Sequence, residues 1–335
     1  MIKQYEKLIF LFVIVAGIFL VRALYPNISA LPSFASTQKP TQTAIVQTTT
    51  NPPTLVLPQT SVAGTTGAGT NDGAANTDPS ASVTNSVFSR VGNTPVPALN
   101  EEEYMVADLT TGAVLAGSND DARWPTASIT KLMTATLILD QLPTSTQITI
   151  TPQMFAADPQ EFTLVVGGTY TVEDLLHLML MPSSNVAAEA MADYIGRTQF
   201  MNEMNERAKQ WGMNDTYFAD PSGISATNES TANDLLILAQ HVYNNYPDIL
   251  AITDTHQTKI TEQNSGKKLL VTSINDFAGE PEFIGGKTGH TDQAGNNLLS
   301  VFNYDGHPVI IIIFNTNDRF GNTAKLYAWF RANYK

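Results

Sequence analysis

From about residue 96 onward, the apolar residues follow two different patterns along the chain. Near both ends of this region, short apolar runs are separated by turn signals such as Thr110-Thr-Gly112 and Asp305-Gly306. Two runs joined by such a turn predict a β-hairpin. The hairpin strands that we expect are Tyr104–Leu109, Ala113–Gly117, Asn297–Phe302 and Val309–Phe314.

Between the hairpins, longer apolar runs have the composition of helices. The run that begins at Ser128 contains no glycine or proline, and Pro125 before it is a typical start signal. Pro182 and Gly196 each end a helix. The expected helices are 128–140, Val172–Met181, Ser184 or Asn185 to Ile195, Phe200–Trp211, Thr231–Tyr243 and Thr323–Tyr334, and the expected short strands are Gln147–Ile150, Gly168–Thr171, Leu269–Thr272 and Phe283–Lys287.

This order of elements predicts an α+β fold. Strands at both ends with helices between them favour an antiparallel sheet that is completed by both ends of the domain, covered by helices and interrupted by an inserted helical region. Residues 96–335 provide enough chain for one sizeable core.

The N-terminal part of the chain has a different pattern. Leu8–Val21 is a continuous apolar run, and Lys3 and Lys7 precede it. Its length is compatible with a signal-peptide core or with a short anchor. We interpret 8–25 as an uncleaved membrane anchor, because no small-residue cleavage signal follows directly. The two lysines before it favour a cytoplasmic location for residues 1–7. Cleavage would instead release the protein, and in both cases the bulk of the chain is exported.

Residues 26–95 are rich in Thr, Ser, Pro, Gly and Ala. Their apolar content is too low to form a core, so we predict a disordered tether between the anchor and the folded domain. Such a tether would let the domain work at some distance from the membrane.

Composition excludes several kinds of chemistry. The chain has no cysteine, so neither a disulfide framework nor a thiolate nucleophile is available. Its five histidines are scattered, and we expect no metal site and no cofactor. A formal net charge of −13 without a basic cluster argues against a nucleic-acid partner.

Three short motifs carry candidate chemistry: Ser128-Ile-Thr-Lys131, Ser183-Ser-Asn185 and Lys287-Thr-Gly289. Ser-x-x-Lys also occurs at Ser36–Lys39, in the tether, and at Ser265–Lys268, which is typical of a polar turn. Only the copy at Ser128 opens a predicted helix, where residues i and i+3 share a face.

Lys131 therefore has the spacing to act as a base for a Ser128 nucleophile. Each motif alone also fits an ordinary structural role: an amphipathic helix with a surface lysine, a helix cap after a proline, or a strand that ends in a turn.

Together, the motifs resemble those of one family. The segments Pro125–Ala135, Met181–Ala188 and Gly286–Gly295, with Asp220-Pro-Ser-Gly-Ile224, are similar to the low-molecular-mass penicillin-binding proteins, which are D-alanyl-D-alanine carboxypeptidases of the penicillin-recognising serine enzymes. The resemblance extends from about Tyr104 to the C-terminus. It implies a β-lactamase/transpeptidase-like α/β/α sandwich, peptidoglycan stem peptides ending in D-Ala-D-Ala as substrate, and β-lactams as covalent inhibitors.

The resemblance also implies roles for individual residues. Ser128 would be the nucleophile, Lys131 the base, and Ser183 a proton relay to the leaving amine. Asn185, Lys287, Thr288, Gly289 and His290 would bind substrate, and the backbone N–H groups of Ser128 and His290 would form the oxyanion hole. We expect no catalytic role for the His290 ring.

One departure from the family bears on specificity. Many members carry an arginine upstream of the Lys-Thr-Gly strand that meets the substrate carboxylate, yet no arginine lies between Arg207 and Arg319. Lys267 or Lys268 could substitute, although a point charge fits a carboxylate less well than a guanidinium does, and the sequence leaves open which group replaces the arginine.

Four alternatives to a carboxypeptidase can be weighed against the motifs. A DD-endopeptidase that cleaves peptidoglycan cross-links would use the same residues. A class A β-lactamase requires a glutamate that we do not find in a Glu-x-x-Leu-Asn context. A catalytically inactive peptidoglycan-binding module would usually have lost a nucleophile or base, and a surface adhesin would explain the tether but not the motifs.

Overall fold

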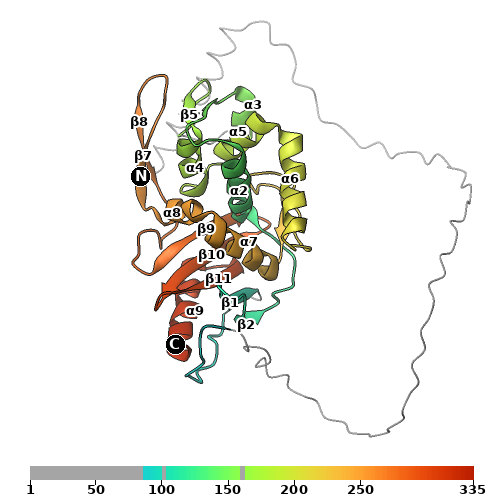
Figure 1. Ribbon diagram of the computed structural model, residues 1–335, viewed down its shortest axis with the longest axis vertical. Helices are drawn as coiled ribbons and strands as arrows, with labels where there is room; N and C mark the ends of the chain where they lie inside the picture. Colours follow the sequence, from blue (N-terminus) through green and yellow to red (C-terminus); the bar gives the residue numbers. More distant parts are fainter. Residues whose placement is uncertain (1–85, 100–102, 159–162) are drawn as a thin grey trace, which may run out of the picture. The chain divides into compact units, whose positions relative to one another are not determined.

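The structure is a computed structural model that describes residues 86–99, 103–158 and 163–335. Its main sheet has five antiparallel strands in the order β2-β1-β11-β10-β9 (Figure 1). These strands are β1 Tyr104–Asp108, β2 Val114–Ser118, β9 Phe283–Thr291, β10 Gly295–Tyr304 and β11 His307–Thr316. Both predicted hairpins are confirmed, and β1 pairs with β11, so the two ends of the domain complete one sheet as expected.

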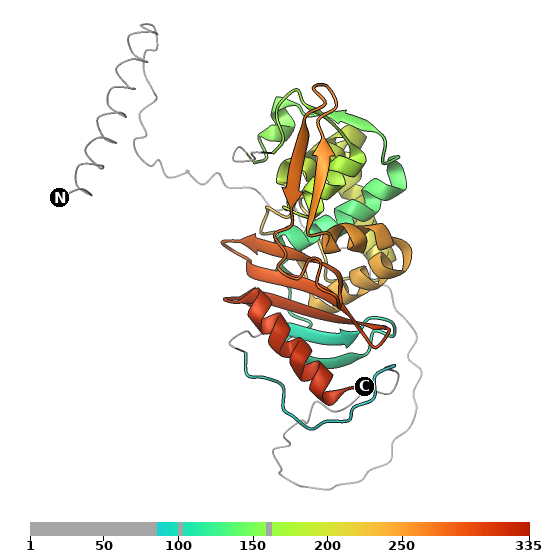
Figure 2. The same ribbon diagram turned by 90° about the vertical axis from the view of Figure 1, so that its left-hand side faces the viewer.

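The central strand β11 contributes side chains to a hydrophobic core on each face of the sheet. Ile310 and Ile312 belong to the larger core on the helical side, whereas Val309, Ile311 and Ile313 belong to a second core. Helix α9, Arg319–Asn333, covers that second side and lies across the sheet in Figure 2. A strand that is buried on both faces reads as a continuous apolar run, as this one does.

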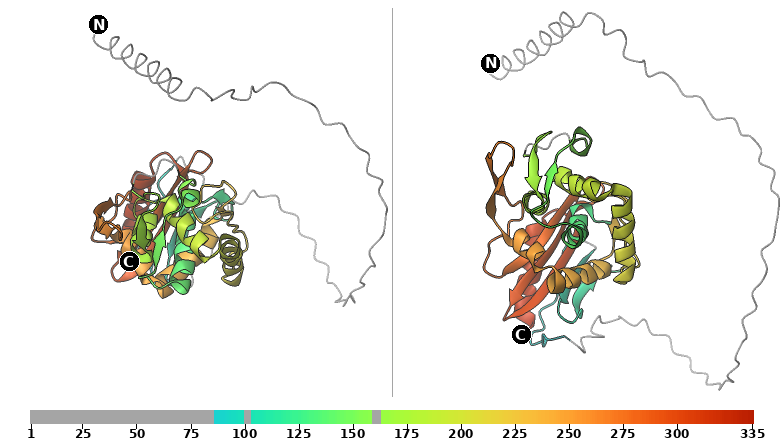
Figure 3. Two further views of the ribbon diagram at one scale, coloured as in Figure 1. Left: turned by 90° about the horizontal axis from the view of Figure 1, so that it is seen from above. Right: turned by 45° about the horizontal axis from the view of Figure 1, so that its top comes forward.

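The helical region packs on the opposite face of the sheet from α9 (Figures 1 and 3). Its centre is α2, in which every residue from Lys131 to Ile138 is buried. The helices of this region are η1 Ala127–Thr130 (a 3₁₀ turn), α2 Lys131–Gln141, α3 Pro152–Phe155, α4 Val172–Leu180, α5 Asn185–Ile195, α6 Arg197–Gln210, α7 Ala232–Asn245 and α8 Pro247–Asp254. Three two-stranded pairs complete it: β3 Trp124–Pro125 with β6 Glu229–Ser230, β4 Gln147–Thr149 with β5 Thr169–Thr171, and β7 Gln257–Thr261 with β8 Lys268–Thr272.

The predicted helix boundaries around Pro182 and Gly196 are confirmed. Helix α4 ends at Leu180, and the Ser184 hydroxyl accepts a hydrogen bond from Ala187 N at the start of α5. Gly196 follows α5 with φ = 118°, a conformation that glycine adopts without a steric penalty.

Several boundaries differ from the sequence expectation. The folded domain begins before residue 96, because Phe88 is buried and the backbone of Val91 donates to Asn333 O at the end of α9. The helix expected from Ser128 begins as the 3₁₀ turn η1, and α2 proper starts at Lys131. Helix α9 begins at Arg319, four residues before Thr323, because the Asp318 side chain caps it by accepting from Gly321 N.

Elements α3, α8 and β7 were not expected at all. The polar turn predicted at Ser265–Lys268 does join two strands, β7 and β8. Among the described residues, no helix is long and apolar enough to cross a membrane. The expected anchor at 8–25 and the Ser36–Lys39 copy of the motif lie outside the described residues.

Candidate active site

Ser128 and Lys131 form a hydrogen-bonded pair at the junction of η1 and α2. Lys131 Nζ lies 2.9 Å from Ser128 Oγ. In a 3₁₀ turn, residues i and i+3 lie almost above one another, so the shift from helix to 3₁₀ turn preserves the predicted contact. Ser128 is half-buried, whereas no part of the Lys131 side chain is exposed to solvent (0%). The pair therefore joins an accessible hydroxyl to an amine that is shielded from water.

Lys131 has two other partners that only accept hydrogen bonds. Its Nζ donates to Asn185 Oδ1 at 2.7 Å and to Ser222 O at 2.5 Å. A neutral lysine amine has two N–H donors and one lone pair. When both donors are used by the amide oxygen and the carbonyl, the lone pair is left for the hydroxyl proton of Ser128. This geometry fits a general base.

The electrostatics of Lys131 agree with that role. Burial disfavours the ammonium form and lowers the pKa of Lys131 to about 7, although the negative charges of Asp220 and Asp158 act in the opposite direction. A base with a pKa near neutrality combines a useful neutral fraction with useful basicity.

Asp220 holds the Ser222 carbonyl in place. Its carboxylate accepts hydrogen bonds from the backbone N–H groups of Ser222, Gly223 and Ser225 and from the Asn228 side chain. Burial acts to raise the pKa of Asp220, but these hydrogen bonds outweigh burial and hold it below the usual value. The sequence motif Asp220–Ile224 includes this loop, but its contact with Lys131 through the Ser222 carbonyl emerges only from the structure.

Glycine is required in that loop. Gly223 has φ = +84°, and a Cβ added there would lie 1.9 Å from Ala127 O. The loop therefore packs directly against the backbone that precedes Ser128. Ala127 itself has φ = 48°, in the left-handed region that non-glycine residues rarely adopt.

The second motif lies between α4 and α5. Ser183 has φ = 68°, and Ser184 N donates to Leu178 O, so the chain turns sharply after Pro182. This turn presents the side chain of Ser183 toward β9, while Asn185 in the first turn of α5 contacts Lys131.

The third motif occupies β9. Lys287 Nζ donates to Ser183 Oγ at 2.9 Å and to Thr288 O at 3.0 Å. Burial, together with the charges of Lys131 and Arg319, holds the pKa of Lys287 well below its usual value. A Cβ at Gly289 would lie 2.7 Å from Thr126 O, so glycine lets β9 approach the segment before Ser128.

The structure thus brings seven predicted site residues into one region: Ser128, Lys131, Ser183, Asn185, Lys287, Thr288 and Gly289. His290 follows on β9 with an exposed ring, whose Nδ1 lies 3.2 Å from Gly295 O at the β9–β10 turn. The arrangement places the half-buried Ser128 hydroxyl beside two buried lysine side chains, Lys131 and Lys287.

Comparison with known proteins assigns this arrangement to a family. A family model described as D-alanyl-D-alanine carboxypeptidase matches residues 91–318. The chain belongs to the D-alanyl-D-alanine carboxypeptidase family. All three motifs and the Asp220 loop fall inside the matched region.

Several known proteins are similar to this chain in sequence or in fold. A D-alanyl-D-alanine endopeptidase of Escherichia coli is 31% identical over 70% of this chain and 78% of its own length. A D-alanyl-D-alanine carboxypeptidase structure from Mycobacterium tuberculosis is 27% identical, with a TM-score of 0.66, over 72% of this chain and 95% of that one. Penicillin-binding protein D2 of Listeria monocytogenes, solved in an ampicillin-bound form, is 29% identical, with a TM-score of 0.59, over 70% and 98% of the two chains.

Arg319, which lies beside the Lys-Thr-Gly strand, was not anticipated from the sequence. Arg319 lies at the start of α9, and its Nη1 donates to Gly289 O at 3.2 Å. The guanidinium is half-buried and close enough to Lys287 to lower the pKa of that lysine. Arg319 follows the Lys-Thr-Gly motif in sequence, and only the pairing of β9, β10 and β11 brings it back beside that motif.

The expectation for Lys267 and Lys268 is wrong. Both side chains are exposed at the turn of the β7–β8 hairpin. That turn is attached to β5, because Gln263 N donates to Thr169 O. The turn therefore presents these lysines beside β5, while the Lys-Thr-Gly strand has Arg319 as its neighbouring cation.

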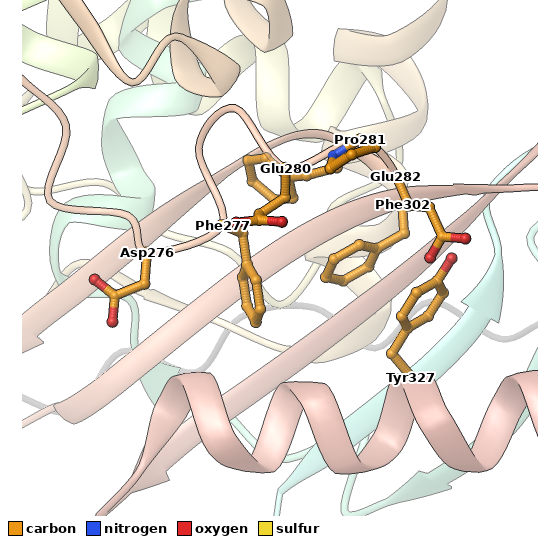
Figure 4. A pocket seen from close by; sticks show the side chains of 8 residues that line it. Asp276, Phe277, Glu280, Pro281, Glu282, Phe302 and Tyr327 are labelled. Carbon is orange, nitrogen blue, oxygen red and sulfur yellow. The ribbon is translucent and has the colours of Figure 1, made fainter.

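A separate pocket of about 580 Å³ lies between the loop before β9 and helix α9 (Figure 4). Its lining residues are Asp276, Phe277, Glu280, Pro281, Glu282, Phe283, Phe302 and Tyr327. None of them belongs to the three motifs. We therefore place the chemistry at the Ser128 cluster and not at this pocket.

Proposed function

We propose that this protein hydrolyses the terminal D-Ala-D-Ala bond of peptidoglycan stem peptides through an acyl-enzyme on Ser128. The observation that carries this proposal is the 2.9 Å contact of the buried Lys131 amine with the Ser128 hydroxyl, while Asn185 Oδ1 and Ser222 O accept its other hydrogen bonds. In its neutral form this amine would use its two N–H groups on those oxygens and offer its lone pair to the Ser128 proton. Family membership supplies the substrate class.

In the first half-reaction, Ser128 Oγ attacks the carbonyl carbon between the two D-alanines as Lys131 Nζ takes the hydroxyl proton. The C–N bond then breaks, and the proton passes to the leaving amine of D-alanine. Ser183 is suited to relay it, because its hydroxyl lies 2.9 Å from Lys287 Nζ. In the second half-reaction, water attacks the ester, Lys131 takes a proton from that water, and Ser128 recovers its proton as the acyl group leaves.

The C-terminal carboxylate of the substrate needs a positive partner. Lys287 and Thr288 on β9, with Arg319 beside them, offer a lysine amine, a hydroxyl and a guanidinium to the substrate. A guanidinium and a carboxylate form charge-assisted hydrogen bonds that are stronger than neutral ones. This set favours a substrate with a free C-terminus, as a carboxypeptidase requires.

β-Lactams would acylate the same serine, because their strained amide presents a carbonyl and a nearby carboxylate to the same groups. Covalent inhibition by penicillins is therefore part of the proposal.

Cleavage of cross-links is the second candidate activity. The relative from E. coli and another from Haemophilus influenzae, 33% identical over 77% of its length, are both D-alanyl-D-alanine endopeptidases. The chemical groups required are the same in the two reactions, and the substrates differ in whether the leaving amine belongs to a free D-alanine or to a second stem peptide.

We also propose that the N-terminal apolar segment, 8–25, holds the domain on the outer side of the cytoplasmic membrane through the 26–85 segment. Support comes from the apolar run and the two preceding lysines, and from the location of peptidoglycan outside the cytoplasm. Sedimentation of the full chain with membranes, and its loss after deletion of 8–25, would test this location.

The decisive experiment uses the full chain with a peptide ending in Lys-D-Ala-D-Ala, a cross-linked stem-peptide dimer and a fluorescent penicillin. Release of free D-alanine by the protein, detected by mass spectrometry, supports the carboxypeptidase. Cleavage of the dimer alone, with a penicillin adduct, moves the assignment to an endopeptidase. Absence of all three signals would leave an inactive peptidoglycan-binding module.

The Ser128→Ala variant is the matched control, and we expect it to lose product and adduct while keeping the wild-type melting temperature. Ser265→Ala, in the other Ser-x-x-Lys sequence of the folded domain, should retain both. A penicillin adduct on Ser128→Ala would refute the choice of nucleophile.

A further inference from the structure

A carboxylate outside the three motifs contacts the catalytic cluster. Asn185 Nδ2 donates a hydrogen bond to Asp158 Oδ2 at 3.1 Å. Asp158 is in the turn that follows α3, where its backbone N–H donates to Phe155 O. Thr151 caps that helix by accepting from Met154 N. Asp158 is therefore presented to Asn185 by a short, capped helix, not by a free side chain on the surface.

The orientation of the Asn185 amide decides what Lys131 can do. An asparagine side chain has a carbonyl oxygen at one end and an NH₂ group at the other, and rotation by 180° exchanges them. In the observed orientation, the oxygen accepts from Lys131 and the NH₂ group donates to Asp158. In the flipped orientation, the NH₂ group would face the amine and would take the lone pair that Ser128 needs.

We propose that Asp158 is a positioning residue for the acylation reaction: it holds the Asn185 amide in the orientation that leaves the Lys131 lone pair to Ser128. A carboxylate accepts hydrogen bonds but cannot donate them when ionised, so it selects the NH₂ end of Asn185. This inference rests on the proposed function of the Ser128–Lys131 pair.

The charge of Asp158 makes the inference testable through pH. The titratable groups around Lys131 come from three elements: Asp158 after α3, Asp220 in the loop before β6, and Lys287 on β9. Both carboxylates raise the pKa of Lys131 against the effect of burial. Removal of the Asp158 charge therefore moves the pH at which Lys131 loses its proton to a lower value.

Two variants separate the effect of Asp158 on the orientation of the Asn185 amide from the effect of its charge on Lys131. Asp158→Ala removes both the hydrogen-bond acceptor and the charge. We therefore expect its maximal acylation rate by a fluorescent penicillin to fall by about 10- to 100-fold, as for a misplaced catalytic group. The acid limb of its pH–rate profile should also move to lower pH. Asp158→Asn keeps an oxygen that accepts from Asn185, so much of the rate should return while the acid limb stays at the shifted position.

Asp121→Ala is the matched control, because Asp121 also accepts a hydrogen bond from an asparagine, Asn233, on an exposed surface. It should keep the wild-type rate and profile. Rates are normalised to the fraction of protein that forms an adduct, which removes losses due to misfolding.

The possible results have distinct meanings. A wild-type protein that forms no adduct would refute the proposed function itself. An active wild type together with an Asp158→Ala variant of equal rate, or of reduced rate with an unshifted acid limb, would overturn the positioning role of Asp158.

Discussion

The amine of Lys287 and the hydroxyl of Ser183 lie 2.9 Å apart, although 104 residues separate them in the chain. This hydrogen bond links the Lys-Thr-Gly strand of the sheet to the turn between α4 and α5 in the helical region. Lys131 makes the other link, because its amine contacts both Ser128 and Asn185. The two buried lysines therefore join three distant motifs into one cluster between the sheet and the helices.

The pH dependence of acylation should follow the protonation of Lys131. Its pKa is lowered to about 7, so below that pH the amine is protonated and has no lone pair for the Ser128 proton. Above it, the neutral amine predominates. We expect the rate of penicillin acylation to rise about tenfold per pH unit on the acid side and to level off above neutrality, when measured from about pH 5 to about pH 9. A rate that does not change over this interval would contradict the assignment of Lys131 as the base.

Arg319 should contribute to recognition of the substrate carboxylate. We expect Arg319→Ala to raise KM for a peptide ending in D-Ala-D-Ala by about 10- to 100-fold, because a hydrogen bond to a charged group is lost. The KM of Arg319→Lys should lie between those of the wild type and Arg319→Ala, since an ammonium cannot bind a carboxylate through a planar fork.

The control for Arg319 is the same peptide with a C-terminal amide, which has no carboxylate to recognise. Its KM should change little in Arg319→Ala. An equal increase in KM for the peptide with a free C-terminus and for its C-terminal amide would show that Arg319 supports β9 structurally and does not select the free C-terminus.

Gly223 and Gly212 allow steric contact to be separated from backbone strain. Both have positive φ, +84° and +86°, but a Cβ at Gly223 would collide with Ala127 O, whereas nothing lies within 4 Å of one at Gly212. Gly212→Ala should lower the free energy of unfolding by about 1–2 kcal/mol, the cost of the left-handed conformation.

Gly223→Ala adds an overlap to the same strain, so we expect a loss of about 3 kcal/mol or more together with slower acylation. Urea denaturation measures the first effect and penicillin labelling the second. Similar unfolding free energies for the two variants would mean that the Asp220 loop moves away from Ser128 without cost.

Much of this fold can be predicted from local patterns. The turn signals Thr110-Thr-Gly112 and Asp305-Gly306 each join two apolar runs, and the structure contains both hairpins. Pro182 and Gly196 mark the helix ends correctly, because their effects are local. Proline has no N–H to donate within the helix, and glycine, which has no Cβ, adopts the positive φ that follows a helix end. The boundaries of α2 and α9 were less accurate, since 3₁₀ geometry at Ser128 and the Asp318 cap depend on contacts that spacing alone does not encode.

For the site, the sequence alone determined the residues of the three motifs and the i, i+3 relation of Ser128 and Lys131, because the local backbone brings these two side chains together. Only the tertiary structure decided that Arg319, and not Lys267 or Lys268, lies beside the Lys-Thr-Gly strand, that Asp220 supports the Ser222 carbonyl, and that Asp158 contacts Asn185. These partners come from separate loops and strands. Their proximity depends on strand pairing and on the packing of helices against the sheet, which bring together residues that no local pattern relates.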